Sequence, residues 1–292
     1  MAYELNPEPL VLELLSQVNK LAVETEILVY DDGSNPEHQN KLARSLKSFP
    51  SLRLILAESN SGRAKARNKL ASLTQGEFVL MLDGDIGLAR PDFLAHYWHH
   101  RLKNGVVIGG KELASDSSQS ASELRYKYCQ KREIKSASDR EKQSFMGFQT
   151  TAFLTDKEVF KTVHFNENLV GYGHEDSLFG LDLQEEGFDI KHIDNPCLYP
   201  ADESSAKFLL KTDDALLNLL RIEKWRPNLG HLFPLLRLKN RARLFHWAIR
   251  IKAFFLKPLL KRQLLSRSPS LLVYDLYRLM RLIELNRLNK ID

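Results

Sequence analysis

Strand-like and helix-like segments alternate along the first two hundred residues, and this alternation constrains the fold more than any other feature. The β-rich runs "EILVYDDGS", "LRLILA" and "FVLML" are separated by segments with helical spacing at Pro36–Phe49 and Gly62–Leu73. Alternation of this kind predicts a mostly parallel sheet with helices on both faces. We therefore predict an α/β, Rossmann-like domain over residues 1–203 and a helical, basic region over residues 204–292.

Acidic residues follow three of the predicted strands or the loops after them. They are Asp31 and Asp32, Asp83 and Asp85, and Glu175 and Asp176. Ligands of open α/β sheets bind at the carboxyl ends of the strands, so these positions are candidates for a site. Each cluster also has a structural explanation: a turn with an Asp cap, a solvated turn, and a helix N-terminus where acids favour the dipole.

The "FVLMLDGD" stretch is the strongest of these indications of a functional site. Its five apolar residues predict a strand buried on both faces, and two carboxylates follow immediately. Such carboxylates repel each other unless a cation or a hydrogen-bonded hydroxyl compensates them. We therefore favour a functional reading for Asp83 and Asp85.

Composition limits the class of protein. The 292 residues are 43% apolar and 27% charged, which suits a globular protein with a sizeable core. Cys129 and Cys197 fit no metal or redox spacing, so we expect free thiols in a reducing compartment. We predict a cytoplasmic protein, because we find neither a signal peptide nor an apolar run near the ~20 residues that cross a bilayer.

Positive charge is concentrated near the C-terminus. Between Lys224 and Tyr274 there are 12 Lys or Arg residues and no acid, although the whole chain has a net charge of only +5. Within this segment, residues 230–265 combine Leu, Phe and Trp with cations at helical spacing. Such a helix can lie on an anionic membrane. The alternatives are nucleic-acid binding, which we do not favour because no such motif occurs, and packing on the catalytic domain with solvated cations.

Four stretches in order resemble the inverting family 2 glycosyltransferases of the GT-A fold: "ILVYDDGS", "NSGRAKARN", "VLMLDGDIGLARPDFL" and "GYGHEDSLFGLDLQEEGF". The resemblance covers residues 10–199. The last stretch is also similar to the "GED" segment of galactosyl- and N-acetylgalactosaminyltransferases. Residues 1–203 are thus expected to form a GT-A catalytic domain.

The resemblance implies roles in donor binding. Asp85 would be the ligand of a divalent cation, Mn²⁺ or Mg²⁺, and Asp83 would contact the ribose, or the metal through water. Asp32 would accept a hydrogen bond from the base, with Asp31 beside it. The nucleotide site would also include the loop "NSG".

In that loop and the helix after it, Asn60 and Gly62 are candidates for nucleotide-sugar binding, because glycine allows close approach of the backbone. Arg67 is a candidate for the phosphates. The alternative is a capped amphipathic helix whose arginines are merely solvated.

The resemblance also implies catalytic roles. Asp176 would be the general base and Glu175 would bind the acceptor, although the reverse assignment is open. Gly171 and Gly173 would let their loop close over the donor. His174 is a weaker candidate for a metal or phosphate contact.

Two departures from the family pattern are visible. Relatives begin with a strand similar to "SIIIPVYN", whereas this sequence starts at "MAYELNPEPL". We expect the first strand to be missing or truncated, with Tyr3 and Asn6 as its remainder and strand edges left exposed. Relatives often carry a metal-binding histidine after "HIDNP", where this chain has Tyr199, and His192 lies on the preceding strand.

We predict an inverting glycosyltransferase of the hexosyltransferase type. It would move a sugar from a nucleotide donor, UDP-linked, to a glycan or lipid-linked acceptor in surface polysaccharide synthesis, at the inner face of the cell membrane. The alternatives are a catalytically impaired, membrane-associated sugar-nucleotide-binding protein and a sugar-phosphate nucleotidyltransferase. The second would need a Gly-rich phosphate loop near the N-terminus, and we find none.

Overall fold

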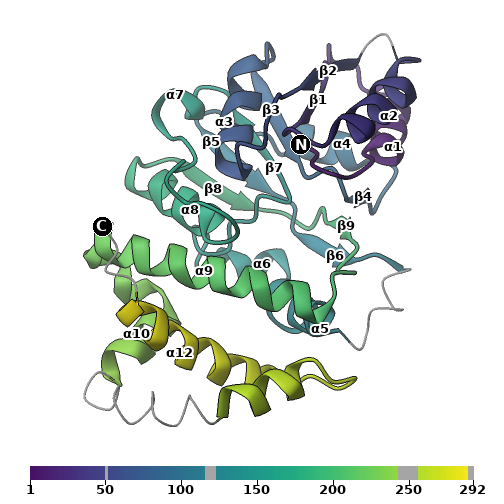
Figure 1. The fold of residues 1–292 in the computed structure, drawn as a ribbon. Coiled ribbons are helices and arrows are strands. Elements are labelled where there is room, and N and C mark those ends of the chain that lie inside the picture. The colour runs from purple at the N-terminus through teal and green to yellow at the C-terminus, as the bar shows by residue number, and fades with distance from the viewer. Residues whose placement is uncertain (50–51, 116–122, 243–255, 289–292) are drawn as a thin grey trace. The chain divides into compact units, whose positions relative to one another are not determined.

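The computed structural model divides into two compact units (Figure 1). It describes the chain except residues 50–51, 116–122, 243–255 and 289–292. Unit 1 consists of Met1–Ala114, Glu133–Glu167 and Glu175–Pro200, and unit 2 consists of Ser115–Arg132, Asn168–His174 and Ala201–Asp292. The domain boundary predicted between residues 203 and 204 stays a prediction.

A four-stranded sheet forms the centre of unit 1. Its order is β3 (Phe78–Leu82), β7 (Ala152–Asp156), β5 (Gly105–Ile108) and β8 (Asp189–His192). Strand β7 runs antiparallel to both neighbours, whereas β5 and β8 are parallel. The predicted α/β class is confirmed, and the sheet is mixed because β7 enters it in the opposite direction.

Two further sets of strands complete unit 1. Strands β1 (Ile27–Asp31) and β2 (Leu52–Leu56) form a separate parallel pair. The second set is a three-stranded sheet in the order β4 (Gly87–Leu88), β9 (Cys197–Tyr199) and β6 (Lys111–Leu113). Sequence analysis did not find the second set, because strands of two or three residues show no measurable periodicity.

Helices cover both faces of the four-stranded sheet. Residues of α3 (Arg63–Leu73), α7 (Val159–Thr162) and α8 (Glu175–Glu185) pack on one face, in a core that includes Val79 and Met81. Residues of α1 (Glu8–Val18) and α4 (Phe93–His99) pack on the other face. The remaining helices of unit 1 are α2 (Pro36–Leu46), which packs with α1 against β1 and β2, and α6 (Ala137–Glu141). These faces explain the apolar spacing seen in the sequence.

Strand β3 is less buried than predicted. Val79 and Met81 are buried, but Phe78, Leu80 and Leu82 are only half-buried. The expectation of full burial on both faces was therefore wrong for the face that carries Phe78, Leu80 and Leu82.

The start of the chain contributes a single bridge rather than a strand. Ala2 pairs in parallel with Asp31. Tyr3 is 48% exposed, and the Asn6 side chain bonds Glu8, so neither of them continues the pairing. The predicted truncation of the first strand stays a prediction.

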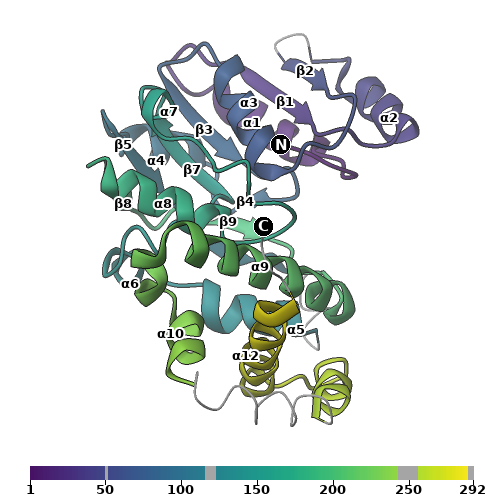
Figure 2. The ribbon, with the colours of Figure 1, turned by 60° about the vertical axis from the view of Figure 1, so that its left-hand side comes forward.

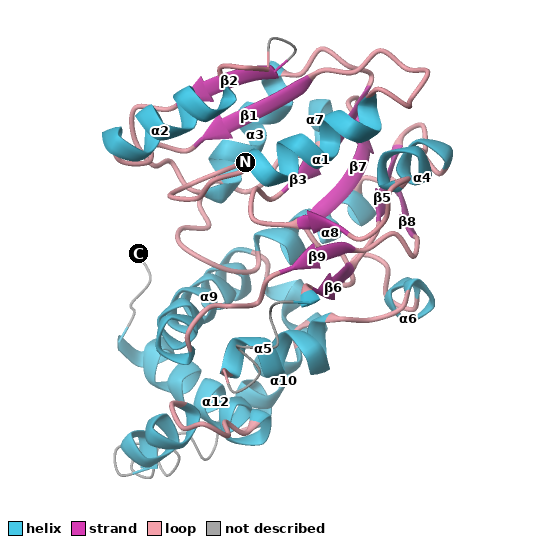
Figure 3. Ribbon diagram, turned by 90° about the vertical axis from the view of Figure 1, so that its right-hand side faces the viewer, coloured by secondary structure: helices cyan, strands magenta, loops and turns pink. Residues whose placement is uncertain are grey.

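The regular elements described in unit 2 are helices, which are joined by loops and turns (Figures 2 and 3). Its elements are α5 (Leu124–Tyr128), η2 (Cys129–Glu133), α9 (Ser205–Trp225), η3 (Pro227–Leu232), α10 (Pro234–Arg241), a helix at residues 256–264 and α12 (Leu271–Leu288). The last residue of η2, Glu133, is the first residue of a unit 1 segment. A core of Leu124, Phe208, Leu264 and Tyr274 joins α5, α9, the 256–264 helix and α12. Among the described residues, no helix is both long and apolar enough to cross a bilayer. The predicted basic segment is described only in part, because residues 243–255 lie outside the described range.

Candidate active site

Asp32 anchors the loop that precedes α3. Its Oδ1 accepts from the Ser61 backbone N–H at 3.0 Å and from Ser61 Oγ at 2.7 Å, and its Oδ2 accepts from Gly62 N–H at 2.9 Å. The residue is only 2% exposed. The carboxylate predicted to face the base therefore holds the loop of residues 60–62 beside the end of β1.

Asp31 accepts hydrogen bonds from a different set of residues. Its Oδ2 accepts from Ser34 N–H and from Gln39 Nε2, each at 2.9 Å, and its Oδ1 accepts from Ser34 Oγ at 2.5 Å. The side chain is completely buried. Asp31 thus forms the turn after β1, which is the structural alternative that the sequence offered for the "DDGS" stretch.

Close backbone contact fixes the position of the "NSG" loop. A Cβ on Gly33, whose φ is +72°, would lie 2.1 Å from the Ser59 carbonyl carbon, so only glycine fits there. Asn60 Nδ2 donates to the Asp32 carbonyl oxygen at 3.1 Å, and Gly62 has a φ of +88° with open space at its Cβ position. The predicted residues Asn60 and Gly62 therefore lie together, and the freedom of Gly62 is needed for its backbone conformation.

Arg67 lies at the centre of the candidate site. It is on the inner face of α3 and is 2% exposed. Its Nη2 bonds Asp83 Oδ1 at 2.9 Å, and its Nη1 lies 3.8 Å from Glu175 Oε1. Nη1 is buried without a hydrogen-bond partner in the described structure. The alternative of a merely solvated arginine is wrong for Arg67, because its guanidinium lies between two carboxylates from distant parts of the chain.

Arg63 supports the same acid from the surface. Its Nη1 is 3.8 Å from Glu175 Oε1, and its side chain is 40% exposed. For Arg63, the structure agrees better with the alternative that the arginines of this helix are solvated.

Asp83 and Asp85 follow β3 as predicted. Asp83 is half-buried and paired with Arg67, whereas Asp85 is exposed. Among the described residues, no group of three or more His, Cys, Asp or Glu side chains is placed to hold a metal ion. Two carboxylates separated by one residue still fit a hard cation that keeps water and takes further oxygen ligands from a diphosphate.

Asp176 is a candidate acid whose surroundings change its acidity. Burial, and after it the neighbouring Glu175 carboxylate, raises the pKa of Asp176 to about 6. Lys111 and Arg67 act in the opposite direction. A carboxyl group with this pKa can accept a proton near neutral pH.

Lys111 is a candidate that sequence analysis missed. Its Nζ bonds Glu133 Oε2 at 2.7 Å and lies 4.9 Å from the centre of the Tyr199 ring. The available signal was a lone lysine directly after the "VVIGG" strand, which local pattern alone cannot distinguish from a surface cation.

His192 does not join the acids. Its Nε2 lies 2.9 Å from the Ser144 carbonyl oxygen, and its Nδ1 accepts from Arg140 Nε at 3.1 Å. Burial lowers the pKa of His192. The residue belongs to a buried polar cluster around Arg140 and is not a candidate metal ligand here.

The glycines before the "HED" stretch lie in unit 2. A Cβ on Gly171 (φ +78°) would lie 2.7 Å from Asp214 Oδ2, and one on Gly173 (φ +101°) would lie 2.7 Å from Ala215 Cβ. His174 packs edge-on against Phe233, and loss of solvation lowers its pKa to about 4. In this structure the two glycines permit tight packing against α9, and their role in loop closure stays a prediction.

Comparisons with known proteins identify the family of the chain. Residues 4–163 match the family model described as Glycosyl transferase family 2. A search of curated proteins found no match. Among solved structures, the chain is similar to the mannosyltransferase PcManGT from Pyrobaculum calidifontis in complex with GDP-Man and Mn²⁺, at 14% identity and a TM-score of 0.55, over 99% of this chain and 86% of that one.

A second solved structure, S. aureus TarS 1–349, aligns at 17% identity with a TM-score of 0.49, over 98% of this chain and 90% of that chain. At 14% identity the likeness to PcManGT shows the fold alone, which is GT-A-like. The family model spans more than half of the 292 residues and includes the loop of residues 60–62, Arg67 and both acids after β3. The chain therefore belongs to glycosyl transferase family 2, and it is a glycosyltransferase.

Proposed function

We propose that this protein transfers a sugar, with inversion, from a nucleotide-sugar to a hydroxyl group of a glycan or lipid-linked acceptor. The observation that carries the proposal is Arg67, a buried cation held between Asp83 and Glu175 with one unbonded nitrogen. A buried arginine of this kind suits a ligand with two phosphates, because its guanidinium can pair with phosphate oxygens.

Donor binding would use the loop of residues 60–62, Arg67 and the two acids after β3. Helix α3 begins at Arg63, and the positive end of its dipole favours an anion beside the loop. Asp83 and Asp85 would hold a divalent cation, Mn²⁺ or Mg²⁺. When bound, such a cation neutralises the charge that develops on a diphosphate leaving group.

The nucleotide is proposed as a uridine diphosphate. The structurally similar PcManGT was solved with GDP-Man, so GDP is the natural competitor to test. Asp32 is committed to Ser61 and Gly62, so we propose that it shapes the base site through that loop.

Proton transfer is assigned to Asp176. The acceptor oxygen attacks the anomeric carbon and forms the new glycosidic bond while the bond from that carbon to the phosphate oxygen breaks. The hydroxyl proton passes to the Asp176 carboxylate, and the nucleoside diphosphate leaves with the bonding electrons. Attack from the face opposite the leaving group inverts the configuration.

Glu175 is proposed as the residue that orients the acceptor, in line with the resemblance of its segment to the "GED" stretch of galactosyltransferases. Its carboxylate is 9% exposed and lies 3.8 Å from both Arg63 Nη1 and Arg67 Nη1. A carboxylate held in place by two cations can accept hydrogen bonds from sugar hydroxyls.

Isothermal titration with UDP and Mn²⁺ tests the donor site. We expect Asp85→Ala to abolish UDP binding and Glu175→Gln to leave it intact while transfer is lost. The same titration with GDP in place of UDP tests which base the site prefers. Binding of neither nucleotide would contradict the proposal and favour the alternative of an inactive membrane-associated protein.

A membrane-facing role is proposed for the helical hairpin in unit 2 made by residues 256–276. Its exposed leucines are Leu256, Leu259, Leu265, Leu272 and Leu276. Lys261, Arg262 and Arg267 are exposed on the same hairpin. Leucines next to cations suit the headgroup region of an anionic membrane, where a lipid-linked acceptor and the inner face of the cell membrane would be found.

Flotation with liposomes of stated composition tests this role. We expect vesicles with 30% phosphatidylserine to carry the protein, and a Leu259→Ser, Leu272→Ser variant to float about tenfold less, because each leucine contributes buried apolar area. Equal recovery of both proteins, or equal recovery on neutral vesicles, would contradict membrane binding through this hairpin.

A further inference from the structure

Helix α3 contributes two neighbouring residues that contact different parts of unit 1. Arg67 bonds Asp83 and lies 3.8 Å from Glu175. Asn68, the next residue, bonds the loop that follows α7. Its Nδ2 donates to the Phe165 carbonyl oxygen and its Oδ1 accepts from the Phe165 N–H, each at 2.9 Å. One amide side chain thus satisfies both backbone groups of Phe165.

This pairing is important because Phe165 lies in a stretch without regular secondary structure. Residues 163–166 belong to neither a helix nor a strand. Phe165 is nevertheless only 1% exposed. Since no helix or strand holds its backbone, the two hydrogen bonds from α3 fix the place of this residue. Asn68 therefore determines where the Phe165 ring lies.

The Phe165 ring contacts both the buried cation and helix α8. The Arg67 guanidinium carbon lies 5.5 Å from the ring centroid, within the range of a cation–π contact. The ring stacks on Phe179 of α8, with centroids 4.1 Å apart and planes 10° from parallel. Three further rings contact Phe179 at centroid distances of 5.3–6.2 Å and with tilted planes: Phe148, Phe153 and Phe160. Of these rings, Phe165 lies nearest to Phe179.

Phe179 lies one turn after the candidate acids of α8. It is the i+4 neighbour of Glu175 and the i+3 neighbour of Asp176, and residues at these spacings lie next to each other on a helix. Stacking on Phe165 therefore fixes the first turn of α8, and with it the position of both carboxylates.

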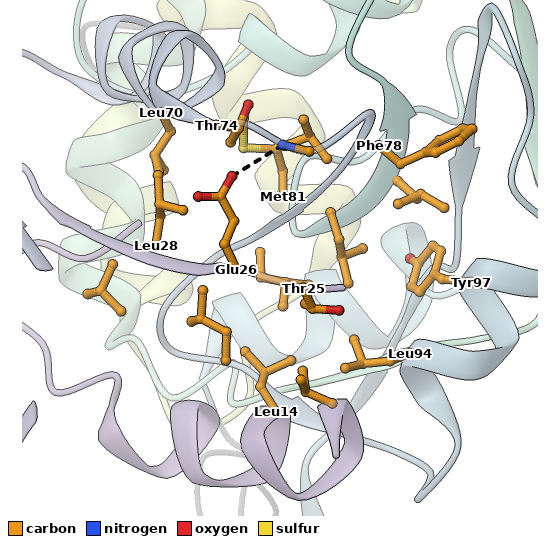
Figure 4. Close-up of a pocket in the computed structure, with 18 of the residues that line it drawn as sticks. Leu14, Thr25, Glu26, Leu28, Leu70, Thr74, Phe78, Met81, Leu94 and Tyr97 are labelled. Atoms are coloured by element: carbon orange, nitrogen blue, oxygen red, sulfur yellow. Dashed lines mark hydrogen bonds between the residues drawn. The ribbon is translucent and has the colours of Figure 1, made fainter. Parts of the chain in front are cut away.

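On another side, α3 packs less tightly. Leu70, one turn after Arg67, lines a cavity of about 240 Å³ together with Leu28 of β1 and Met81 of β3 (Figure 4). Side chains that line a cavity lack some of the contacts that a close-packed interior gives. The position of α3 in unit 1 therefore depends more strongly on the contacts of Arg67 and Asn68.

We propose that Phe165 and Asn68 are positioning residues for sugar transfer, which hold the acids of α8 at a fixed distance from the donor site while Arg67 binds phosphate. This inference rests on the proposed function, because it assumes that a diphosphate pairs with Arg67. Arg67 Nη1 and Glu175 Oε1 are 3.8 Å apart, so their contact is an ion pair without a hydrogen bond. A phosphate oxygen can replace Glu175 there, whereas the contacts from Asn68 through Phe165 to Phe179 contain no charged group that a phosphate would attract.

Phe165→Leu tests the stack, and Phe160→Leu is the matched control. Each variant replaces a buried aromatic ring next to Phe179 with an aliphatic side chain. Asn68 holds the backbone of Phe165, whereas Phe160 lies within helix α7. The two variants should therefore lose similar stability in urea denaturation but differ in their effect on the acids of α8.

Sugar transfer and nucleotide binding are measured on the same proteins. We expect Phe165→Leu to lower the turnover number by about tenfold or more, because a small displacement of a catalytic group slows a reaction strongly. Its Kd for UDP should stay within about threefold of wild type, since Asp83 still pairs with Arg67. Phe160→Leu should change neither value by more than about twofold. A general loss of structure would reduce UDP binding together with turnover, so the split between the two identifies a positioning role.

Amide hydrogen exchange gives a readout that does not depend on sugar transfer. We expect Phe165→Leu to speed exchange in residues 179–182 of α8 by about tenfold relative to wild type and to Phe160→Leu. Asn68→Asp should act in the same direction, because it keeps the shape of the side chain but places a carboxylate oxygen against the Phe165 carbonyl. Glu167→Gln is its control, since this change alters only the exposed Asn68–Glu167 bond of 2.9 Å and should leave the exchange unchanged.

An active wild-type protein with equal turnover and equal exchange in Phe165→Leu and Phe160→Leu would overturn the inference and leave the proposed function intact. Parallel losses of UDP binding and turnover in Phe165→Leu would also overturn it, because the ring would then serve the donor site itself. A wild-type protein that binds neither UDP nor GDP would remove the proposed function, and the inference with it, whatever the exchange in α8.

Discussion

Replacement of Arg67 by methionine is the most direct test of the site's electrostatics. Arg67→Met keeps the bulk of the side chain and removes the cation between Asp83 and Glu175. Arg67 is 2% exposed and the Glu175 side chain is 9% exposed, so water compensates poorly for the lost charge. Breaking a buried pair in this way costs about 3 kcal/mol or more. We expect that loss in equilibrium urea denaturation at pH 7.5.

Arg63→Met is the matched control. Arg63 Nη1 lies at the same 3.8 Å from Glu175 Oε1, but the Arg63 side chain is 40% exposed. Exposed pairs contribute only about 0–1 kcal/mol, so this variant should unfold close to the wild-type midpoint. If the two variants lost equal stability, the argument that burial makes Arg67 the central cation would be refuted.

Three further predictions follow from the geometry. The turnover number should rise with pH and level off above an apparent pKa of about 6, because Asp176 must lose its proton to act as a base, and a flat pH profile would remove Asp176 from that role. Asp176→Asn should abolish transfer, because the base is lost. The raised pKa of Asp176 means that its charged form is disfavoured in the folded protein, so this variant should unfold at the same temperature as wild type or a higher one in calorimetry at pH 8. Gly33→Ala should cost about 3 kcal/mol or more in urea denaturation, because its Cβ meets the Ser59 carbonyl carbon at 2.1 Å, whereas Gly187→Ala, with φ +77° and open space, should cost about 1 kcal/mol.

The elements with strong periodicity could be predicted from the sequence. The "FVLML" run became β3, and the helix predicted at Gly62–Leu73 became α3 at Arg63–Leu73. Local apolar patterns determine such elements, because each one has to present a face to the core. The direction of β7 could not be predicted in this way, since an apolar strand has the same pattern whether it runs parallel or antiparallel.

The convergence of remote acids could also be anticipated, because acids at the carboxyl ends of strands meet at one edge of a sheet. Asp83 and Glu175 come within reach of one guanidinium although they are far apart in the sequence. Lys111 was missed because its partner Glu133 and its neighbour Tyr199 are brought to it by a sheet of very short strands.

What each acid does depends on partners that the local sequence does not reveal, and Asp32 shows this most clearly. The family pattern suggests that Asp32 faces the base directly, whereas here both of its oxygens accept hydrogen bonds from Ser61 and Gly62. These two statements predict different results for Asp32→Asn. An amide can accept only through its oxygen, so the variant should lose the bonds to one of the two residues and loosen the loop of residues 60–62.

If Asp32 acts through the loop, Asp32→Asn should weaken binding of UDP and GDP by similar factors and speed amide exchange at Ser61 and Gly62. If Asp32 reads the base directly, the two nucleotides should be affected unequally, and exchange in the loop should stay unchanged. The structure favours the first result. The Asp32 side chain is 2% exposed and its carboxylate accepts three hydrogen bonds from one loop, so few of its lone pairs are left to bind a ligand.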